Sequence, residues 1–178
     1  LDLKFHDIPN TVAGAVSAAV ATGASIINVH ASGGGDMMRA AGEAAAEGAE
    51  RYGVAKPIVV GVTVLTSMDT LDLQMVGQRG PADEQVLRLA RLTKDAGLDG
   101  VVCSPAESEA VRDTCGKSFV RIVPGIRPSW ASKDDQKRIT TPRQALDAGA
   151  TYLVIGRPIT QADDPVEAAF RIAGEMAE

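Results

Sequence analysis

The chain has 178 residues and a formal net charge of −5, with 45% hydrophobic and 23% charged residues. This balance is that of one soluble globular domain with its own core, but the length is below the roughly 250 residues typical of a complete eight-unit α/β barrel. Lys and Arg are not in surplus, which argues against nucleic-acid and membrane-surface partners, and no apolar run reaches the roughly 20 residues of a membrane span. Two cysteines are too few for a disulfide scaffold, so we expect a cytoplasmic protein.

The first five residues alternate between apolar and charged side chains, which predicts an opening strand. On such a strand Leu1, Leu3 and Phe5 face the helices, whereas Asp2 and Lys4 point into the interior of the fold. An intact protein rarely opens in the middle of a strand. We therefore expect this sequence to be a fragment whose upstream part is absent.

A repeated pattern continues along the chain, in which an Ala-rich helical stretch ends at a Gly and a short β-branched run follows. With the opening strand, the pattern predicts six strands, at residues 1–5, 25–30, 58–64, 100–103, 119–123 and 151–155. Helices are predicted near residues 10–22, 36–52, 83–96, 106–115, 142–148 and 165–177. This alternation predicts an α/β fold with a parallel sheet, organised as a single domain over residues 1–178.

Small or polar residues follow every predicted strand, at the end where the chemistry of an α/β barrel collects. Asp2 and Lys4 are the strongest candidates, because residues two apart on a strand share one face. A charged pair inside a barrel indicates a functional site. The alternative is a buried salt bridge that only fixes the packing.

Other polar residues near the strand ends have simpler interpretations. Asp7 or Thr11 is suited to cap a helix that starts near Pro9 or Val12, and the residue types alone favour capping over catalysis. A hydrogen-bonded histidine of the core explains His30 at least as well as a residue of a functional site does. The glycine-rich turn that follows it is either a plain tight turn or a point where backbone approaches a ligand.

Gly156 and Arg157 follow the last predicted strand and suit a phosphate group, which a backbone N–H and a guanidinium fork bind well. Arg127 follows the preceding strand and belongs to the same neighbourhood, since phosphate sites in such barrels use the last two strand exits. An ordinary surface position is the alternative for each arginine. The long polar segment 128–139 is predicted to be a lid over the phosphate.

Together these residues resemble the orotidine 5′-phosphate decarboxylase family, which performs the last step of UMP biosynthesis. The stretch from Asp2 to Thr11 is similar to the family signature D-x-K-x-x-D-I-x-x-T. The resemblance extends over essentially the whole chain, through residues 28–34, 62–68, 124–128, 135–138 and 154–158.

The resemblance implies an eight-stranded TIM (β/α)8 barrel that acts on orotidine 5′-monophosphate as a homodimer, without a metal ion or organic cofactor. It also implies that this chain is an incomplete barrel containing strand–helix units 3 to 8. The two missing units carry a ribose-binding Asp and the first Lys of an alternating Lys-Asp-Lys-Asp array. The isolated chain is therefore expected to be inactive.

Roles for individual residues also follow from the resemblance. Lys4 donates a proton to C6 of the pyrimidine, while Asp2 lies against the departing carboxylate and orients Lys4. Asp7 completes the charge array and, with Thr11, reaches into the active site of the partner subunit. The matched substrate-binding positions are Thr66 and Ser67 near the base, Gln136, Gly156 and Arg157 at the phosphate, and Arg127 at the same end.

Two alternatives stay open at this point. Magnesium-dependent sugar-phosphate decarboxylases or aldolases of the same superfamily share D-x-K-x-x-D, although the continuation to Thr11 and the Thr66–Ser67 pair favour the orotidylate enzyme. The second alternative is that the chain is a truncated, non-catalytic remnant whose open sheet edges associate with other copies.

Overall fold

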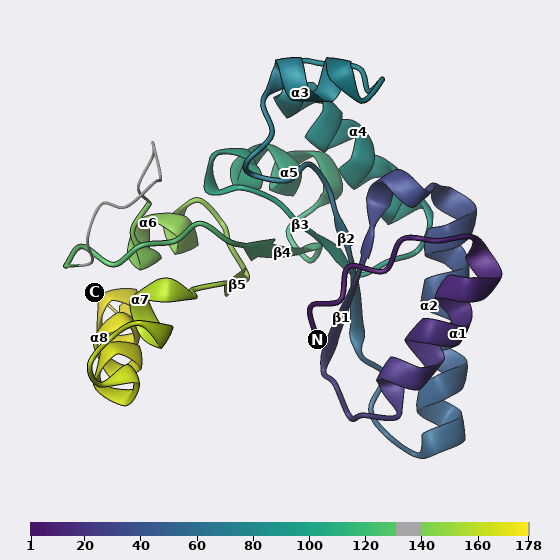
Figure 1. Ribbon diagram of the computed structural model, residues 1–178, viewed down its shortest axis with the longest axis horizontal. Coiled ribbons are helices and arrows are strands. Elements are labelled where there is room, and N and C mark those ends of the chain that lie inside the picture. Colours follow the sequence, from purple (N-terminus) through teal and green to yellow (C-terminus); the bar gives the residue numbers. More distant parts are fainter. Residues whose placement is uncertain (131–139, 178) are drawn as a thin grey trace.

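The structure is a computed structural model that describes residues 1–130 and 140–177. One parallel sheet, shown in Figure 1, has its strands in chain order: β1 (Ile26–His30), β2 (Ile58–Val62), β3 (Gly100–Val102), β4 (Val120–Val123) and β5 (Tyr152–Leu153). Each strand pairs with the next one along the chain, which is the order of an α/β barrel and not of a doubly wound sheet. The sheet stays open over the described residues, so the prediction of an incomplete barrel is confirmed.

Helices separate the strands. They are α1 (Pro9–Val20), α2 (Gly35–Tyr52), α3 (Thr70–Met75), α4 (Ala82–Asp95), α5 (Ser108–Cys115), α6 (Pro142–Asp147), α7 (Arg157–Thr160) and α8 (Pro165–Ala177), with 3-10 turns at Ala31–Gly33 and Pro105–Glu107. All six predicted helices are confirmed, whereas α3 and α7 were not predicted. None of the described helices has both the length and the apolar character needed to cross a membrane.

The glycines of the repeated pattern end the helices as predicted. Gly97 and Gly149 have φ angles of 81° and 96°, a left-handed conformation that residues with a Cβ atom strongly disfavour. Each glycine turns the chain from a helix into the next strand, from α4 into β3 and from α6 into β5. The sheet positions of β3 and β5 therefore depend on these two turns.

The predicted opening strand is not formed, so the sheet has five strands where six were predicted. Phe5 alone makes a parallel bridge with Val29 of β1. The cause is Lys4, whose φ of 49° interrupts the extended backbone. The predicted alternation of faces holds only in part: Phe5 packs against the core, but Leu3 is 55% exposed and Leu1 lines the same cavity as Asp2 and Lys4.

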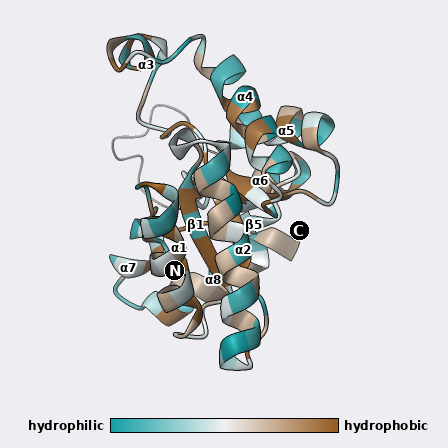
Figure 2. Cartoon of the chain, turned by 90° about the vertical axis from the view of Figure 1, so that its right-hand side faces the viewer, coloured by the Kyte–Doolittle hydropathy of each residue, from teal (hydrophilic) through white to brown (hydrophobic). Residues whose placement is uncertain are grey.

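The core lies between the sheet and its helices. Because only 3% of the residues are aromatic, it is built mainly from Val and Ala, with fewer Leu, Ile and Met. Ile27 and Val29 of β1 are fully buried and belong to the same cluster as Met37 and Met38 of α2. Figure 2 shows hydrophobic colours along the strands and hydrophilic colours on the outer faces of the helices. Burial of one such side chain contributes about 1.5–3 kcal/mol.

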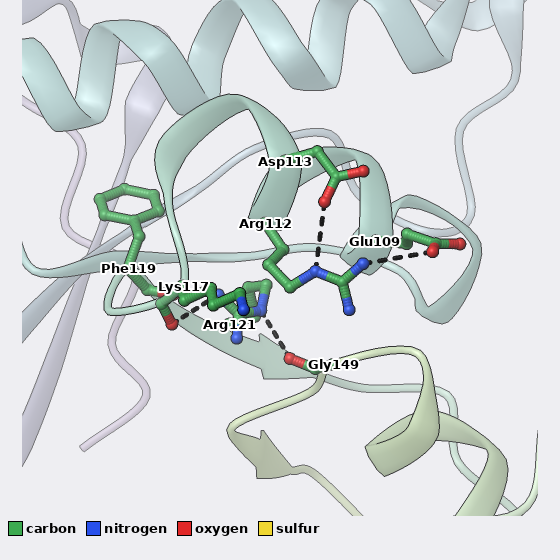
Figure 3. A network of polar contacts seen from close by, with 7 residues as sticks. All are labelled: Glu109, Arg112, Asp113, Lys117, Phe119, Arg121 and Gly149. Carbon is green, nitrogen blue, oxygen red and sulfur yellow. Dashed lines mark hydrogen bonds and ion pairs between the residues drawn. The ribbon is translucent and has the colours of Figure 1, made fainter.

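A buried arginine ties β4 to the turn before β5, as Figure 3 shows. Arg121 is 6% exposed, and its Nε donates to the carbonyl oxygen of Gly149 at 2.5 Å. One terminal nitrogen also donates to the carbonyl oxygens of Phe119 and Lys117. Burial lowers the pKa of Arg121. This network fixes β5, the strand that leads to Gly156 and Arg157.

Candidate active site

The inner face of the sheet, opposite the helices, borders a cavity of about 480 Å³. Strand residues reach it at every second position, so that Ile26 and Asn28 of β1 line it while Ile27 and Val29 face the core. Most of the lining is apolar. Its charged and amide side chains are Asp2, Lys4 and Asn28, which therefore stand out as the chemical centre of the cavity.

Asp2 and Lys4 meet in this cavity, as predicted. The Nζ of Lys4 lies 2.7 Å from Oδ1 of Asp2, and their side chains are 39% and 66% exposed. The hydrogen bond from Lys4, together with one from Asn28, lowers the pKa of Asp2 although partial burial acts in the opposite direction. An ionised carboxylate thus lies beside an ammonium group at an open cavity.

Asn28 is a site residue that the sequence reasoning missed. Its Nδ2 donates to Oδ1 of Asp2 at 2.5 Å, and its Oδ1 accepts from the backbone N–H of Lys4 at 2.7 Å. The sequence did contain a signal, namely one amide side chain inside the apolar run of β1. A polar residue on the inner face of a buried strand needs hydrogen-bond partners, and here they are the charged pair.

His30, at the end of β1, is half-buried and close to the same groups. Its ring centroid lies 5.4 Å from that of His6. Burial, followed by the charges of His6 and Lys4, lowers the pKa of His30, so the ring is neutral at neutral pH. Gly33 in the following turn has close neighbours, because a Cβ there would meet the side chain of Met37 and lie 3.2 Å from Cδ2 of His6.

Asp7 and Thr11 do not cap the first helix, and the prediction that favoured capping is wrong. Ile8 is the N-cap residue of α1 and no side chain caps the helix. The N-cap position belongs to Ile8, whose side chain has no atom that could accept a hydrogen bond from the helix. Asp7 accepts only the neighbouring N–H of Ile8, at 2.6 Å, and both predicted residues are exposed outside the cavity lining.

Thr66 and Ser67 lie in the loop after β2. Thr66 lines the cavity with the charged pair, whereas Ser67 is exposed and is not among the lining residues. Thr66 thus shares the cavity with Lys4, as expected for a residue near a bound base.

The residues predicted to bind phosphate follow β4 and β5. Gly156 precedes α7 and Arg157 is its first residue, and both are exposed. Arg127 is only 4% exposed, so it is not an ordinary surface arginine, and its backbone N–H donates to the carbonyl of Thr140 at 3.0 Å. None of the three is among the residues that line the cavity with Lys4. Gln136 lies outside the described residues.

The segment predicted to be a lid, residues 128–139, is described only at its beginning. Ser129 Oγ donates to Oε1 of Glu175 at 2.9 Å, and the guanidinium of Arg171 lies 4.2 Å from the ring centroid of Trp130. Both partners belong to α8, so this helix anchors the start of the segment. Among the described residues, no three His, Cys, Asp or Glu side chains are grouped to hold a metal ion.

Comparisons with known proteins agree with this geometry. Residues 1–172 match the model of the family described as "Orotidine 5'-phosphate decarboxylase / HUMPS family". The orotidine 5′-phosphate decarboxylase of Saccharophagus degradans is 58% identical over 177 residues, which cover 99% of this chain and 72% of that relative. The Rhodospirillum rubrum relative of the same name is 56% identical over 176 residues, covering 99% and 71%.

A solved structure leads to the same family. The crystal structure of orotidine 5′-phosphate decarboxylase from Lactobacillus acidophilus superposes with a TM-score of 0.88 at 38% identity, over 100% of this chain and 75% of that one. The sequential parallel sheet, the Asp2–Lys4 pair on its inner face and the family match over nearly the whole chain agree with one another. The chain therefore belongs to the orotidine 5′-phosphate decarboxylase / HUMPS family.

Proposed function

We propose that this protein decarboxylates orotidine 5′-monophosphate to UMP in pyrimidine biosynthesis, in the cytoplasm and without a metal ion or organic cofactor. The observation that carries the proposal is the ammonium group of Lys4, held 2.7 Å from the carboxylate of Asp2 at an otherwise largely apolar cavity. Fixed charge in such surroundings acts more strongly than in water.

The pair is suited to a reaction that leaves an electron pair on carbon. The bond between C6 and the carboxyl carbon breaks, CO2 leaves, and the electron pair stays on C6. The Lys4 ammonium stabilises this developing charge and then donates a proton to C6, which leaves Lys4 as a neutral amine to be reprotonated by solvent. Asp2 keeps Lys4 charged and aimed, and repels the substrate carboxylate before it leaves.

The phosphate end contributes binding energy at a distance from the reacting bond. In this proposal Gly156, Arg157 and Gln136 bind the phosphate, Arg127 supports the same end, and Thr66 and Ser67 contact the base. Binding energy of a remote group can organise the reacting end of a site. The separation of Arg157 from the Lys4 cavity supports such a division between binding and chemistry.

A second copy of the chain completes the proposed enzyme. Asp7 and Thr11 are exposed beside Ile8, whose side chain is 66% exposed. Leu71 and Met75 of α3 are also exposed, at 63% and 79%. Exposed apolar side chains of this size favour association. We propose a homodimer in which Asp7 and Thr11 enter the active site of the partner.

A direct assay tests the proposal. The protein at its natural length, with whatever residues its gene encodes beyond 1–178, is mixed with orotidine 5′-monophosphate in EDTA, and loss of the substrate absorbance is followed. We expect turnover that EDTA does not change and that yields UMP. Absence of turnover would refute the proposal, and magnesium-dependent turnover of a sugar phosphate would assign the protein to the neighbouring enzymes of its superfamily.

A further inference from the structure

Asn28 connects the two charged residues of the candidate site, because the amide nitrogen and the amide oxygen of its side chain bind one of them each. Its Nδ2 donates to Oδ1 of Asp2 at 2.5 Å, and its Oδ1 accepts the backbone N–H of Lys4 at 2.7 Å. We propose that Asn28 is a positioning residue, which fixes both the carboxylate that orients Lys4 and the backbone from which the lysine side chain starts. This inference rests on the proposed function, because it assigns Asn28 a part in the same reaction.

The orientation of the carboxamide is determined by its partners. A backbone N–H can only donate and an ionised carboxylate can only accept, so reversal of the amide would place two donors and two acceptors face to face. Asn28 is 8% exposed and lies between Ile27 and Val29, which are fully buried. A buried amide that lost these partners would be destabilised, so the side chain has one favourable arrangement.

Lys4 needs this support because its backbone is strained. Its φ of 49° lies in the left-handed region, which a residue other than Gly adopts only where its surroundings require it. The Asn28 side chain binds the N–H of Lys4, and the carbonyl oxygen of Asn28 accepts the N–H of Phe5 at 3.2 Å. One residue of β1 therefore holds the backbone on both sides of the Lys4 Cα.

Asp2 is fixed at the same time. Nδ2 of Asn28 and Nζ of Lys4 both donate to the same atom, Oδ1 of Asp2. The Asn28 hydrogen bond helps to lower the pKa of Asp2. Because Asp2 is 66% exposed, packing alone does not hold its side chain. Loss of the Asn28 donor should leave Asp2 held only by its hydrogen bond to Lys4, so that the ion pair would no longer be fixed to β1.

Two substitutions distinguish the hydrogen bond to Lys4 from the one to Asp2. Asn28→Leu keeps the branched shape and removes both hydrogen bonds. Asn28→Asp keeps an acceptor for Lys4 but replaces the donor to Asp2 with a negative charge. Thr63→Val is the matched control, because Thr63 is buried beside β2 and its hydroxyl donates to the carbonyl of Val102, away from the charged pair. All variants are made in the natural-length protein.

We expect both Asn28 variants to lower kcat by about 10- to 100-fold, since a shift of about 1 Å in a catalytic group can cost that much. KM for orotidine 5′-monophosphate should change by less than about threefold, because the phosphate end is intact. In Asn28→Leu, carboxyl-carbon NMR should show a higher pKa for Asp2 than in the unsubstituted protein. Thr63→Val should alter neither kcat nor the pKa of Asp2.

Unchanged kcat and an unchanged Asp2 pKa in folded Asn28 variants would overturn the inference. Equal losses of kcat in Thr63→Val and the Asn28 variants, in step with their melting temperatures, would also overturn it, because they would indicate a purely structural role. If the unsubstituted protein does not turn over orotidylate, the proposed function fails. The NMR comparison then still decides whether Asn28 controls Asp2. Should Asn28→Leu not fold, Asn28→Asp and its measured kcat provide the same decision.

Discussion

Substitution of Lys4 by alanine should remove most of the catalysis while leaving the binding of product nearly intact. Unit charges about 4 Å apart interact by about 4 kcal/mol at the effective dielectric of about 20 found near protein surfaces, and by about 1 kcal/mol in bulk water. The Lys4 side chain is 39% exposed, which places its interaction with a carbanion between these limits. Stabilisation of about 1–4 kcal/mol corresponds to roughly 5- to 1000-fold in rate.

Lys4→Ala also removes the proton donor, and general-acid catalysis contributes typically 10²- to 10⁴-fold. We therefore expect kcat to fall by at least about 10³-fold in the natural-length protein. Affinity for UMP, measured by calorimetry, should change by less than about fivefold, because Arg157 and Gly156 lie outside the cavity that holds Lys4. Similar losses in kcat and in UMP affinity would refute the role assigned to Lys4.

Three further predictions concern stability and the isolated chain. Arg121→Met should lower the free energy of unfolding by about 2 kcal/mol in urea titration, since it removes hydrogen bonds to the carbonyl groups of Gly149 and Phe119, and a stability equal to the unsubstituted protein would contradict this. The pKa of His30 is lowered below 6.5 in the folded protein, so the contribution of the neutral ring to the free energy of unfolding is complete above pH 6.5 and is lost as the pH falls through the folded pKa. His30→Gln should therefore make the free energy of unfolding differ less between about pH 7.5 and 5.5, and an unchanged difference would argue against this role. Residues 1–178 expressed alone should turn over orotidylate no faster than their Lys4→Ala variant, because Asp2 is 66% exposed and water weakens the field of the pair; clear turnover would exclude the remnant interpretation.

The regular part of the fold could be predicted because local patterns determine it. Strands β1 to β5 follow β-branched runs, and glycines such as Gly97 and Gly149 mark the helix ends by their positive φ. The opening strand could not be predicted in the same way. Its alternating pattern is genuine, but a hydrogen bond from Lys4 to Asn28, 24 residues away, accompanies a left-handed backbone that ends the strand.

The site was predictable in its centre and less so at its edges. The two-residue spacing of Asp2 and Lys4 led correctly to one ion pair, although not through the regular strand on which the argument rested. Arg127 is buried although arginine is a residue type that usually lies at the surface, so its burial could not be predicted from the residue type.

The unpredicted helix α3 had a local signal as well. Asp69 and Asp72 form a capping box at its start, with each side chain accepting a backbone N–H from the other end of the motif. The helix is short and buries only Leu73 fully, so no apolar periodicity accompanied the capping motif. Capping residues alone were therefore insufficient to predict it.

A crystal structure of the natural-length protein with UMP would test the central claim most directly. We expect the pyrimidine ring in the cavity lined by Val62 and Thr66, with Nζ of Lys4 in contact with C6 and still paired with Asp2. The phosphate should lie at Gly156 and Arg157. A nucleotide bound elsewhere, or one whose C6 faces away from Lys4, would contradict the account.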